Sequence, residues 1–253
     1  MTRPPRASQE KTRPSAFWVL AAVVVPIVGL FARIRIVGAE KLPREGAFVL
    51  APNHHSEIDP LIVAVAVWRA GRAPRFMAKE SLFRVPALGW ALRATGMVPV
   101  SRATTAAAAR QTIATSRELV KHGRGVIVYP EGTLTRDPEL WPMRGKSGAV
   151  RLAMMGDIPL YPMAQWGAQE LMPRYGKISL WPLRKRMTVV IGDPVDLSAY
   201  RSAPKTPAAL ADATTVVMDA VADLLSGIRG IPAPKERWDP SAHGQKETGR
   251  LDS

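Results

Sequence analysis

The sequence predicts a single α/β domain in which a mostly parallel sheet is flanked by helices. From residue 33 onward, short apolar runs of strand length alternate with segments of helical periodicity. Strands that are joined through helices pair in parallel and are covered on both faces. The chain has 253 residues, of which 47% are hydrophobic, so it is long enough to build one sizeable core.

Several strands are expected, each short, apolar and bounded by turn residues. They cover residues 33–37, 47–51, 75–78, 97–100, 126–129, 160–164 and 187–191. The first of them is also compatible with an antiparallel position at the edge of the sheet. Helices are expected at residues 60–68, 86–94, 104–121, 148–155 and 207–225. The third helix has an alanine-rich body, and Gly123 beyond its end favours a stop there.

Two segments precede this pattern and one follows it. Residues 1–15 are polar, basic and rich in proline, a composition that predicts a disordered arm. Residues 16–32, AFWVLAAVVVPIVGLFA, are apolar and uncharged. Residues 231–253 lose periodicity and predict a loosely attached polar tail. The remaining residues 33–230 form the expected α/β domain.

The apolar segment 16–32 would form a helix about 25 Å long, just under the thickness of a bilayer core. Its apolar run is long for a cleaved signal peptide, and no clear small-residue cleavage site follows it. A membrane span, an interfacial helix kinked at Pro26 and a structural core helix all remain open. Basic residues on both flanks would suit anionic phospholipid headgroups, so membrane contact is favoured.

Charge and cysteine content limit the possible functions. The formal net charge of +14 favours a polyanionic partner, which means nucleic acid, an anionic bilayer surface or a phosphate-bearing small molecule. Nucleic acid is disfavoured because the chain has no zinc-finger spacing, no basic stripe with interleaved aromatic residues and no helix-turn-helix pattern. The chain has no cysteine, which excludes disulfides, thiolate nucleophiles and Cys-type zinc sites.

Polar side chains follow several of the predicted strands. The stretch Asn53-His54-His55-Ser56-Glu57-Ile58-Asp59 comes directly after strand 47–51. Lys79, Arg102 and the string Glu131-Gly132-Thr133 follow the next strands along the chain. Because ligands of open α/β sheets bind beyond the carboxyl ends of the strands, we expect these groups to lie at one edge of the sheet.

His54 and Asp59 are the strongest candidates for a catalytic pair. A histidine with a pKa near neutrality can take a proton from an alcohol, and a carboxylate behind it fixes its tautomer and stabilises the imidazolium. Asp59 before Pro60 is also typical of a helix start, so a capping role stays open at this point. A metal site at His54, His55 and Asp59 is disfavoured, because the HExxH pattern and further ligands are missing.

The other candidates are weaker when each is taken alone. Lys79 and Arg102 could hold a phosphate, and the string Glu131-Gly132-Thr133 could line an anionic pocket, but all could equally be ordinary surface residues. Three known sequence motifs of nucleotide-binding and hydrolytic enzymes are incomplete in this chain. A Walker A loop would need glycine where Leu140 stands, a nucleophile elbow would need glycine in place of Ala149, and no third glycine completes a dinucleotide loop after Gly123.

Together these blocks resemble the motifs of the glycerolipid acyltransferases. The NHxxxxD block corresponds to residues 53–59, a second block ending in Gly and Arg to residues 79–102, the EGT block to residues 131–133, and a Pro-centred apolar strand to residues 158–162. Lys146 and Gly148 match the lysine and glycine that lead the helix between the last two blocks. The resemblance covers about residues 35 to 200. It is strongest to the bacterial lysophosphatidic acid acyltransferases.

The resemblance implies an acyltransferase with a glycerol-phosphate acyltransferase-like fold. His54, held by Asp59, would deprotonate the sn-2 hydroxyl of 1-acylglycerol 3-phosphate, which then attacks the thioester of acyl-CoA or acyl carrier protein. Phosphatidic acid for phospholipid biosynthesis would form without an acyl-enzyme, a metal or a cofactor. Lys79, Arg102, Glu131, Gly132 and Thr133 would shape the pocket for the acceptor's phosphate, with Asn53, Ser56 and Lys146 in support.

The resemblance also implies a location at the cytoplasmic membrane, with the active site facing the cytoplasm and residues 16–32 as a peripheral contact or single anchor. Leu134 departs from the family pattern, in which a polar residue commonly follows EGT, and Arg136 is a candidate substitute. Another lysophospholipid, a lyso-aminolipid or a glycolipid therefore remains an alternative acceptor. A non-catalytic membrane-binding protein, in which residues 54–59 only start a helix, is the alternative from another class.

Overall fold

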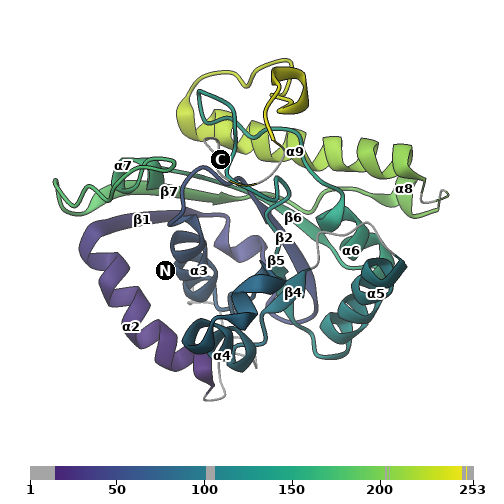
Figure 1. The fold of residues 1–253 in the computed structure, drawn as a ribbon, viewed down its shortest axis with the longest axis horizontal. Helices are drawn as coiled ribbons and strands as arrows, with labels where there is room; N and C mark the ends of the chain where they lie inside the picture. The colour runs from purple at the N-terminus through teal and green to yellow at the C-terminus, as the bar shows by residue number, and fades with distance from the viewer. Residues whose placement is uncertain (1–14, 101–105, 203, 205, 247–248, 250–253) are drawn as a thin grey trace.

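A five-stranded sheet in the order β1-β7-β6-β2-β5 forms the centre of the protein (Figure 1). The structure is a computed structural model, and it describes residues 15–100, 106–202, 204, 206–246 and 249. The strands of this sheet are β1 (Ala32–Val37), β2 (Phe48–Pro52), β5 (Gly125–Ile127), β6 (Leu160–Trp166) and β7 (Lys185–Ile191). A second sheet of two strands consists of β3 (Met77–Lys79) and β4 (Val98–Val100).

The strands are connected mostly through helices, as the alternating pattern predicts. The α-helices are α2 (Ala16–Phe31), α3 (Asp59–Arg69), α4 (Pro86–Ala94), α5 (Ala106–Lys121), α6 (Gly148–Gly156), α7 (Ala168–Leu171), α8 (Ser198–Arg201) and α9 (Pro207–Arg229). Short 3-10 helices lie at η1 (Ala39–Lys41), η2 (Glu80–Arg84) and η3 (Ser241–His243). The one-turn helices α7 and α8 are not predicted, and the expected start at residue 104 lies outside the described residues.

Neighbouring strands of the central sheet run parallel with one exception. β2 pairs in parallel with both β5 and β6, and β1 pairs in parallel with β7. β6 and β7 are antiparallel. The segment between them, residues 167–184, reverses the direction of the chain, and no long helix carries the chain back to the opposite end of the sheet before β7 begins. The mostly parallel sheet is therefore confirmed. β1 lies at the edge and pairs in parallel with β7, and because β7 is antiparallel to β6, both strands run opposite to β2, β5 and β6. The expected antiparallel edge strand is therefore confirmed in its direction, although its own neighbour is parallel to it.

Helices cover both faces of the central sheet, with α9 above it and α2 and α3 below it in the view of Figure 1. Alternate residues of β2 point to opposite faces. Phe48 and Leu50 join the core cluster that contains residues of α2 and α3. Val49 and Ala51 join the cluster that contains residues of α6 and α9. Burial on both faces explains why the strand reads as a continuous apolar run.

The apolar N-terminal segment forms α2, which is only partly buried. Phe17 packs near the Arg75 guanidinium, whose carbon lies 5.1 Å from the ring centroid, and Val28 joins the main core. Several large apolar side chains of the helix are exposed: Trp18, Val19, Leu20, Val23, Ile27 and Leu30. Within the described part of the chain, no helix combines the length and apolar character needed to cross a bilayer.

The C-terminal segment is not the loosely attached tail that its composition predicts, at least over residues 231–246. The carbonyl of Trp238 accepts the N–H of Arg144 at 3.0 Å, and Arg237 forms an ion pair with Asp219 of α9. Arg144 also pairs with Asp239, 3.1 Å away. Such contacts join this segment to the loop after β5 and to α9 through polar side chains and backbone groups, so hydrophobic periodicity does not reveal them. The tail prediction is wrong for these residues.

Candidate active site

The candidate active site is built on the turn between β2 and α3, at the carboxyl end of a central strand. Asn53 fixes the start of this turn against β6. Its Oδ1 accepts the N–H of Gln165 at 2.8 Å, and its Nδ2 donates to the carbonyl of Gln165 at 3.1 Å. The Asn53 side chain thereby continues the pairing of the two strands, which gives it a structural role beneath the site.

The buried carboxylate of Asp59 closes the turn. Its Oδ2 accepts the N–H groups of His55 at 2.6 Å and Ser56 at 2.8 Å, and it lies 3.0 Å from Nδ1 of His54. The carboxylate binds residues that precede it, whereas a helix cap would bind the residues that follow it. The capping role is therefore wrong, and the five-residue spacing of His54 and Asp59 corresponds to one reversal of the chain.

This contact determines the tautomer of His54. An ionised carboxylate can only accept hydrogen bonds, so Nδ1 carries the proton and Nε2 keeps the lone pair. The side chain of His54 is 16% exposed, whereas that of Asp59 is fully buried. The ring of Tyr129 stacks on the His54 imidazole, with 4.0 Å between ring centroids. His54 is thus a base whose ring is held in place by Asp59 and Tyr129 and remains partly exposed to solvent.

The charges around His54 favour this arrangement. Burial alone would raise the pKa of Asp59, but the neighbouring His55 and His54 rings and the N–H of Ser56 outweigh it and lower the pKa below its usual value. Burial raises the pKa of Tyr129 well above its usual value, and Asp59 adds to this effect, so the phenol stays neutral. Asp59 is therefore the negative group that faces the imidazole.

His55 has a different place from His54. Burial lowers the pKa of His55 despite the attraction of Asp59, so its ring is neutral. Its Nδ1 lies 3.0 Å from Nδ2 of Asn53, which is a donor, and Nδ1 therefore acts as the acceptor. Nε2 then carries the proton and lies 3.9 Å from Oδ1 of Asp59, which is too far for a hydrogen bond. His55 packs beneath the site and is completely buried.

The loop after β5 holds both backbone groups of His54. Oε1 of Glu131 accepts the N–H of His54 at 2.9 Å, and Oε2 accepts the N–H of Met143 at 3.0 Å. The N–H of Thr135 donates to the carbonyl of His54 at 2.6 Å. The resemblance implies that Glu131 helps to shape the pocket for the acceptor's phosphate, and in the structure both of its oxygens bind backbone donors. Its geometry is that of a positioning residue for His54.

The remaining predicted residues lie near this loop or outside the described region. Gly132 has φ +70°, a conformation that favours glycine, and a Cβ there would lie 3.3 Å from Cδ of Lys146. Thr133 is half-buried, and Lys146 is exposed. Ser56 donates its hydroxyl to the carbonyl of Met172 at 2.6 Å. Ser56 therefore supports the turn that carries His54, whereas Gly132, Thr133 and Lys146 belong to the loop between β5 and α6.

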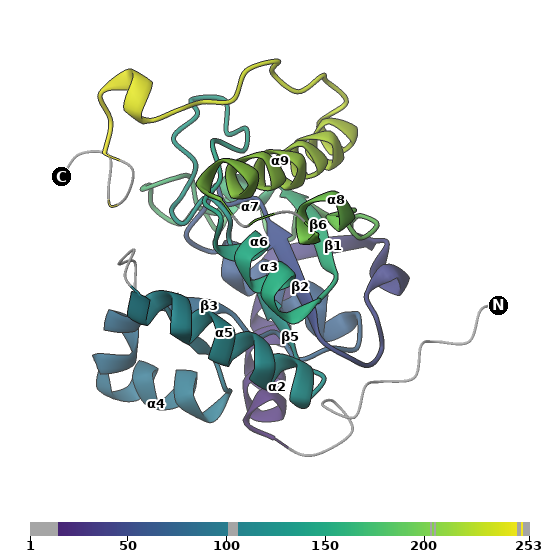
Figure 2. The ribbon, with the colours of Figure 1, turned by 90° about the vertical axis from the view of Figure 1, so that its right-hand side faces the viewer.

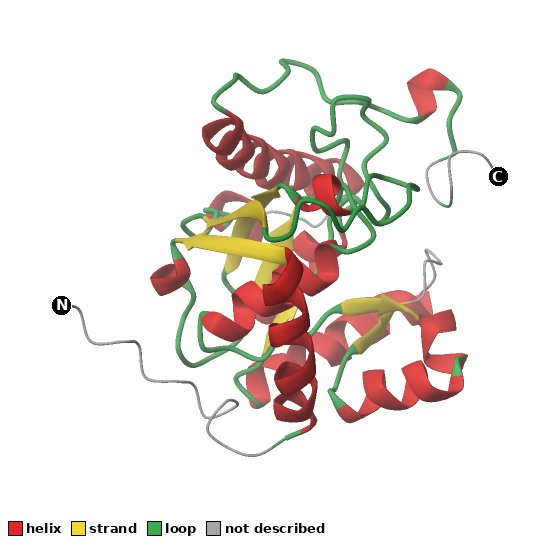
Figure 3. Ribbon diagram, turned by 90° about the vertical axis from the view of Figure 1, so that its left-hand side faces the viewer, coloured by secondary structure: helices red, strands yellow, loops and turns green. Residues whose placement is uncertain are grey.

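The two predicted phosphate-binding cations are not tested by the structure. Lys79 ends β3, and Phe76 just before this strand bridges in parallel to Ile127 of β5. β3 therefore points in the same direction as β5, although it belongs to the small sheet that Figure 3 shows apart from the central one. The side chain of Lys79 and all of Arg102 lie outside the described residues.

One residue near the site, Tyr129, is missing from the sequence-based prediction, and Arg136 enters that prediction only as a candidate substitute for the polar residue after EGT. Tyr129, which stacks on His54, follows β5 immediately before Pro130, and its place at a strand end is the signal that could have identified it. Arg136 is 2% exposed and donates from Nη2 to the carbonyl of Gly249 at 3.1 Å. Its Nε and Nη1 have no hydrogen-bond partner among the described residues. No group of three His, Asp or Glu side chains in this described part is placed to hold a metal.

Comparisons with known proteins identify relatives of the chain. A family model described as Acyltransferase matches residues 33–166. A 1-acyl-sn-glycerol-3-phosphate acyltransferase of Bacillus subtilis is 30% identical over 178 residues, which cover 70% of this chain and 81% of the relative. The chloroplastic enzyme BAT2 of Brassica napus, which has the same activity in its name, is 31% identical over 144 residues, or 56% of this chain. The chain spans only 40% of the length of that plant relative.

A solved structure agrees with the fold. The crystal structure of the 1-acyl-sn-glycerophosphate acyltransferase PlsC from Thermotoga maritima superposes with a TM-score of 0.63 at 22% identity. The match covers 88% of this chain and 81% of that one. At this level of identity the likeness supports the shared α/β fold.

The buried Glu131 predicts a pH dependence of stability. Burial raises its pKa to about 8 from the usual 4.5, against the N–H groups of Met143 and His54 that lower it. Between these pH values the unfolded chain releases a proton that the folded protein keeps, so the free energy of unfolding falls as the pH rises from about 4.5 to about 8. Urea unfolding of the wild type and of Glu131→Gln over this range measures the effect. Glu131→Gln should show a smaller fall, and equal falls would contradict the prediction.

Proposed function

This chain belongs to the glycerolipid acyltransferase family, and on that basis we propose that it acylates the sn-2 hydroxyl of 1-acylglycerol 3-phosphate to give phosphatidic acid. The observation that carries the proposal is the 3.0 Å contact between Nδ1 of His54 and Oδ2 of Asp59, which leaves Nε2 of a partly exposed imidazole as the base. The acceptor is proposed from the names of the relatives.

In the proposed reaction, Nε2 of His54 takes the proton of the acceptor hydroxyl while the hydroxyl oxygen attacks the thioester carbonyl of acyl-CoA or acyl carrier protein. The new C–O ester bond forms, the C–S bond breaks, and the departing sulfur takes the proton from Nε2. Asp59 stabilises the imidazolium between the two proton transfers. No acyl-enzyme is required, because the acceptor itself is the nucleophile.

The acceptor's phosphate needs a cation near the loop after β5. Lys79 and Arg102 are the cations proposed from the family pattern, and Arg136 is a further candidate. A buried guanidinium with two unbound nitrogens is costly unless an anion compensates it. Leu134 is buried and its side chain is apolar, so this side chain offers no polar contact to the acceptor. This departure supports another lysophospholipid, a lyso-aminolipid or a glycolipid as the second candidate acceptor.

We also propose that an anionic phospholipid surface is the site of action, with the active site on the cytoplasmic side. Both substrates carry acyl chains, and the exposed apolar side of α2 is suited to the interfacial region of a bilayer. Further exposed apolar residues, Leu82, Leu88 and Trp90, lie on η2 and α4. Figures 1 and 2 show α2 and α4 at the same end of the molecule. The location is proposed on this surface alone.

Replacing the base should remove acyl transfer. His54→Ala should lower the rate of transfer from labelled acyl-CoA to lysophosphatidic acid in vesicles by about 10²- to 10⁴-fold, which is the rate acceleration that a general base usually provides. Asp59→Asn should also lower it, because the carboxamide does not hold the tautomer and charge of His54 as the carboxylate does. Circular dichroism and thermal unfolding serve as controls for folding. Full activity of His54→Ala would contradict the mechanism.

The same assay decides the acceptor when it is run with a panel of lysophosphatidic acid, other lysophospholipids, a lyso-aminolipid and a glycolipid. Turnover of lysophosphatidic acid supports the first proposal. Turnover of another acceptor with none on lysophosphatidic acid supports the second. An absence of transfer to every acceptor, from both acyl-CoA and acyl carrier protein, would contradict both.

Membrane contact through α2 should depend on its exposed apolar residues. Ile27 is 55% exposed, so Ile27→Asp should weaken binding to phosphatidylcholine vesicles that contain phosphatidylglycerol by about tenfold, since a charge replaces apolar area that the bilayer would cover. Co-sedimentation measures this binding. Ile231→Asp is the matched control, because Ile231 is also exposed but follows α9. Equal binding of the two variants would show that α2 is not the contact.

A further inference from the structure

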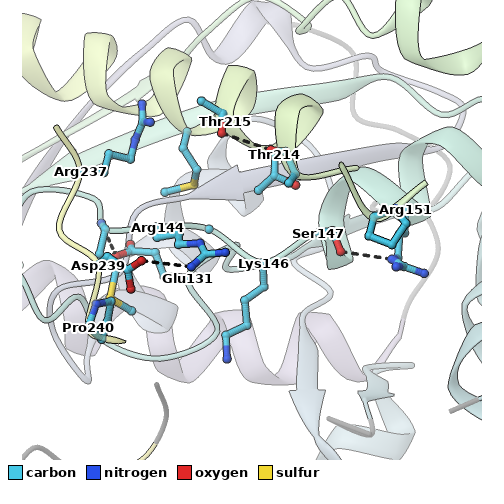
Figure 4. A pocket seen from close by; sticks show the side chains of 15 residues that line it. Glu131, Arg144, Lys146, Ser147, Arg151, Thr214, Thr215, Arg237, Asp239 and Pro240 are labelled. Carbon is cyan, nitrogen blue, oxygen red and sulfur yellow. Dashed lines mark hydrogen bonds and ion pairs between the residues drawn. The ribbon is translucent and has the colours of Figure 1, made fainter. Parts of the chain in front are cut away.

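A second candidate site is a cavity of about 640 Å³ that borders Glu131 but not His54 or Asp59 (Figure 4). Its walls come from four parts of the chain. These are the loop before α6, the first turn of α6, the N-terminal half of α9 and the C-terminal residues 237–240. The site is thus next to the loop that holds His54, yet its lining is separate from the catalytic pair.

The lining of the cavity is predominantly cationic. It includes Arg144, Lys146, Arg151 and Arg237, against the two acidic residues Glu131 and Asp239. Burial raises the pKa of Glu131 to about 8, which reduces its negative charge near neutral pH. The positive charge therefore exceeds the negative charge by about two to three units, a marked excess for one cavity.

The guanidinium of Arg151 has donors left for a ligand. Its Nε donates to Oγ of Ser147 at 3.2 Å, and its two Nη atoms have no partner among the residues that the structure describes. Ser147 precedes α6, and its side chain makes no capping hydrogen bond. The first N–H groups of α6 therefore lack a side-chain cap and add the positive end of a helix dipole to the same wall.

The opposite wall of the cavity is less polar. Pro207, Ala211 and Met218 of α9 supply apolar surface beside Thr214 and Thr215. The hydroxyls of the two threonines donate to carbonyls of their own helix, so they remain available only as acceptors. A ligand with one anionic end and one organic end would match both walls.

From this lining we propose that the cavity binds a phosphate ester at a site distinct from the His54–Asp59 pair. Arginine forks and a lysine ammonium are the side chains that recognise phosphate oxygens. A volume of about 640 Å³ is typical of small-molecule pockets and is much larger than phosphate alone requires. The nucleotide end of an acyl-CoA and the headgroup of an anionic lipid share this chemistry. Binding itself does not depend on the proposed acyl transfer.

Isothermal titration calorimetry of the full chain tests this site with adenosine 3′,5′-bisphosphate, glycerol 3-phosphate and inorganic phosphate. We expect binding that weakens as salt is added. Arg151→Gln should weaken it about tenfold or more, as expected when a hydrogen bond to a charged group is lost. Arg35→Gln removes the same charge from an exposed position on β1 and should bind as the wild type does. His54→Ala should also bind normally, which separates this site from the catalytic pair.

The three probes distinguish the sources of the phosphate ester. Tighter binding of adenosine 3′,5′-bisphosphate assigns the cavity to the nucleotide end of a donor, and tighter binding of glycerol 3-phosphate assigns it to a lipid headgroup. Arg237→Gln provides a second variant. It breaks the ion pair with Asp219, but Asp219 is exposed and is not left as a buried charge. Thermal unfolding checks the fold of each protein. The proposal is overturned if no probe binds to the wild type, if Arg151→Gln and Arg237→Gln both bind as tightly as Arg35→Gln, or if His54→Ala abolishes binding.

Discussion

The geometry of the active site depends on one oxygen atom, Oδ2 of Asp59, which receives three hydrogen bonds inside a turn of five residues. Two come from the backbone N–H groups of His55 and Ser56, and the third comes from Nδ1 of His54. The neighbouring His55 and His54 rings, with the N–H of Ser56, lower the pKa of Asp59 and keep the buried carboxylate ionised, and an ionised carboxylate accepts only. The same atom therefore shapes the turn, fixes the tautomer of His54 and supplies the negative charge that an imidazolium requires.

Three strands of the sheet hold this turn in place. β2 delivers His54, β6 binds the side chain of Asn53, and the loop after β5 binds both backbone groups of His54 through Glu131 and Thr135. The EGT string of the sequence thus includes a positioning carboxyl group whose oxygens already accept backbone N–H groups. On its other side the same loop borders the cationic cavity, so a ligand bound there would lie close to the backbone that positions His54.

Much of this arrangement could be predicted from local sequence. Alternating apolar runs and helical patterns identify the strands of a mostly parallel sheet, and the polar strand ends bring His54, Asp59 and Glu131 to one region. The parallel pairing of β1 with β7 could not be predicted, because it depends on how β7 returns beside β6. The cavity could not be predicted either, since Arg144 and Asp239, which form an ion pair in its wall, are 95 residues apart in the sequence. The positioning role of Glu131 could not be predicted either, because the spacing of residues in the sequence does not show that its oxygens bind the N–H groups of His54 and Met143.

Nitrogen-15 NMR of the histidine-labelled protein at mildly alkaline pH tests the central claim most directly, with His54→Ala used to assign the signals. The geometry predicts that Nδ1 of His54 carries the proton and that Nε2 is unprotonated. Asp59→Asn should weaken this preference, because the oxygen that holds Nδ1–H loses its charge. A wild-type protein in which Nε2 of His54 carries the proton would contradict the account, since the nitrogen proposed as the base would then have no free lone pair.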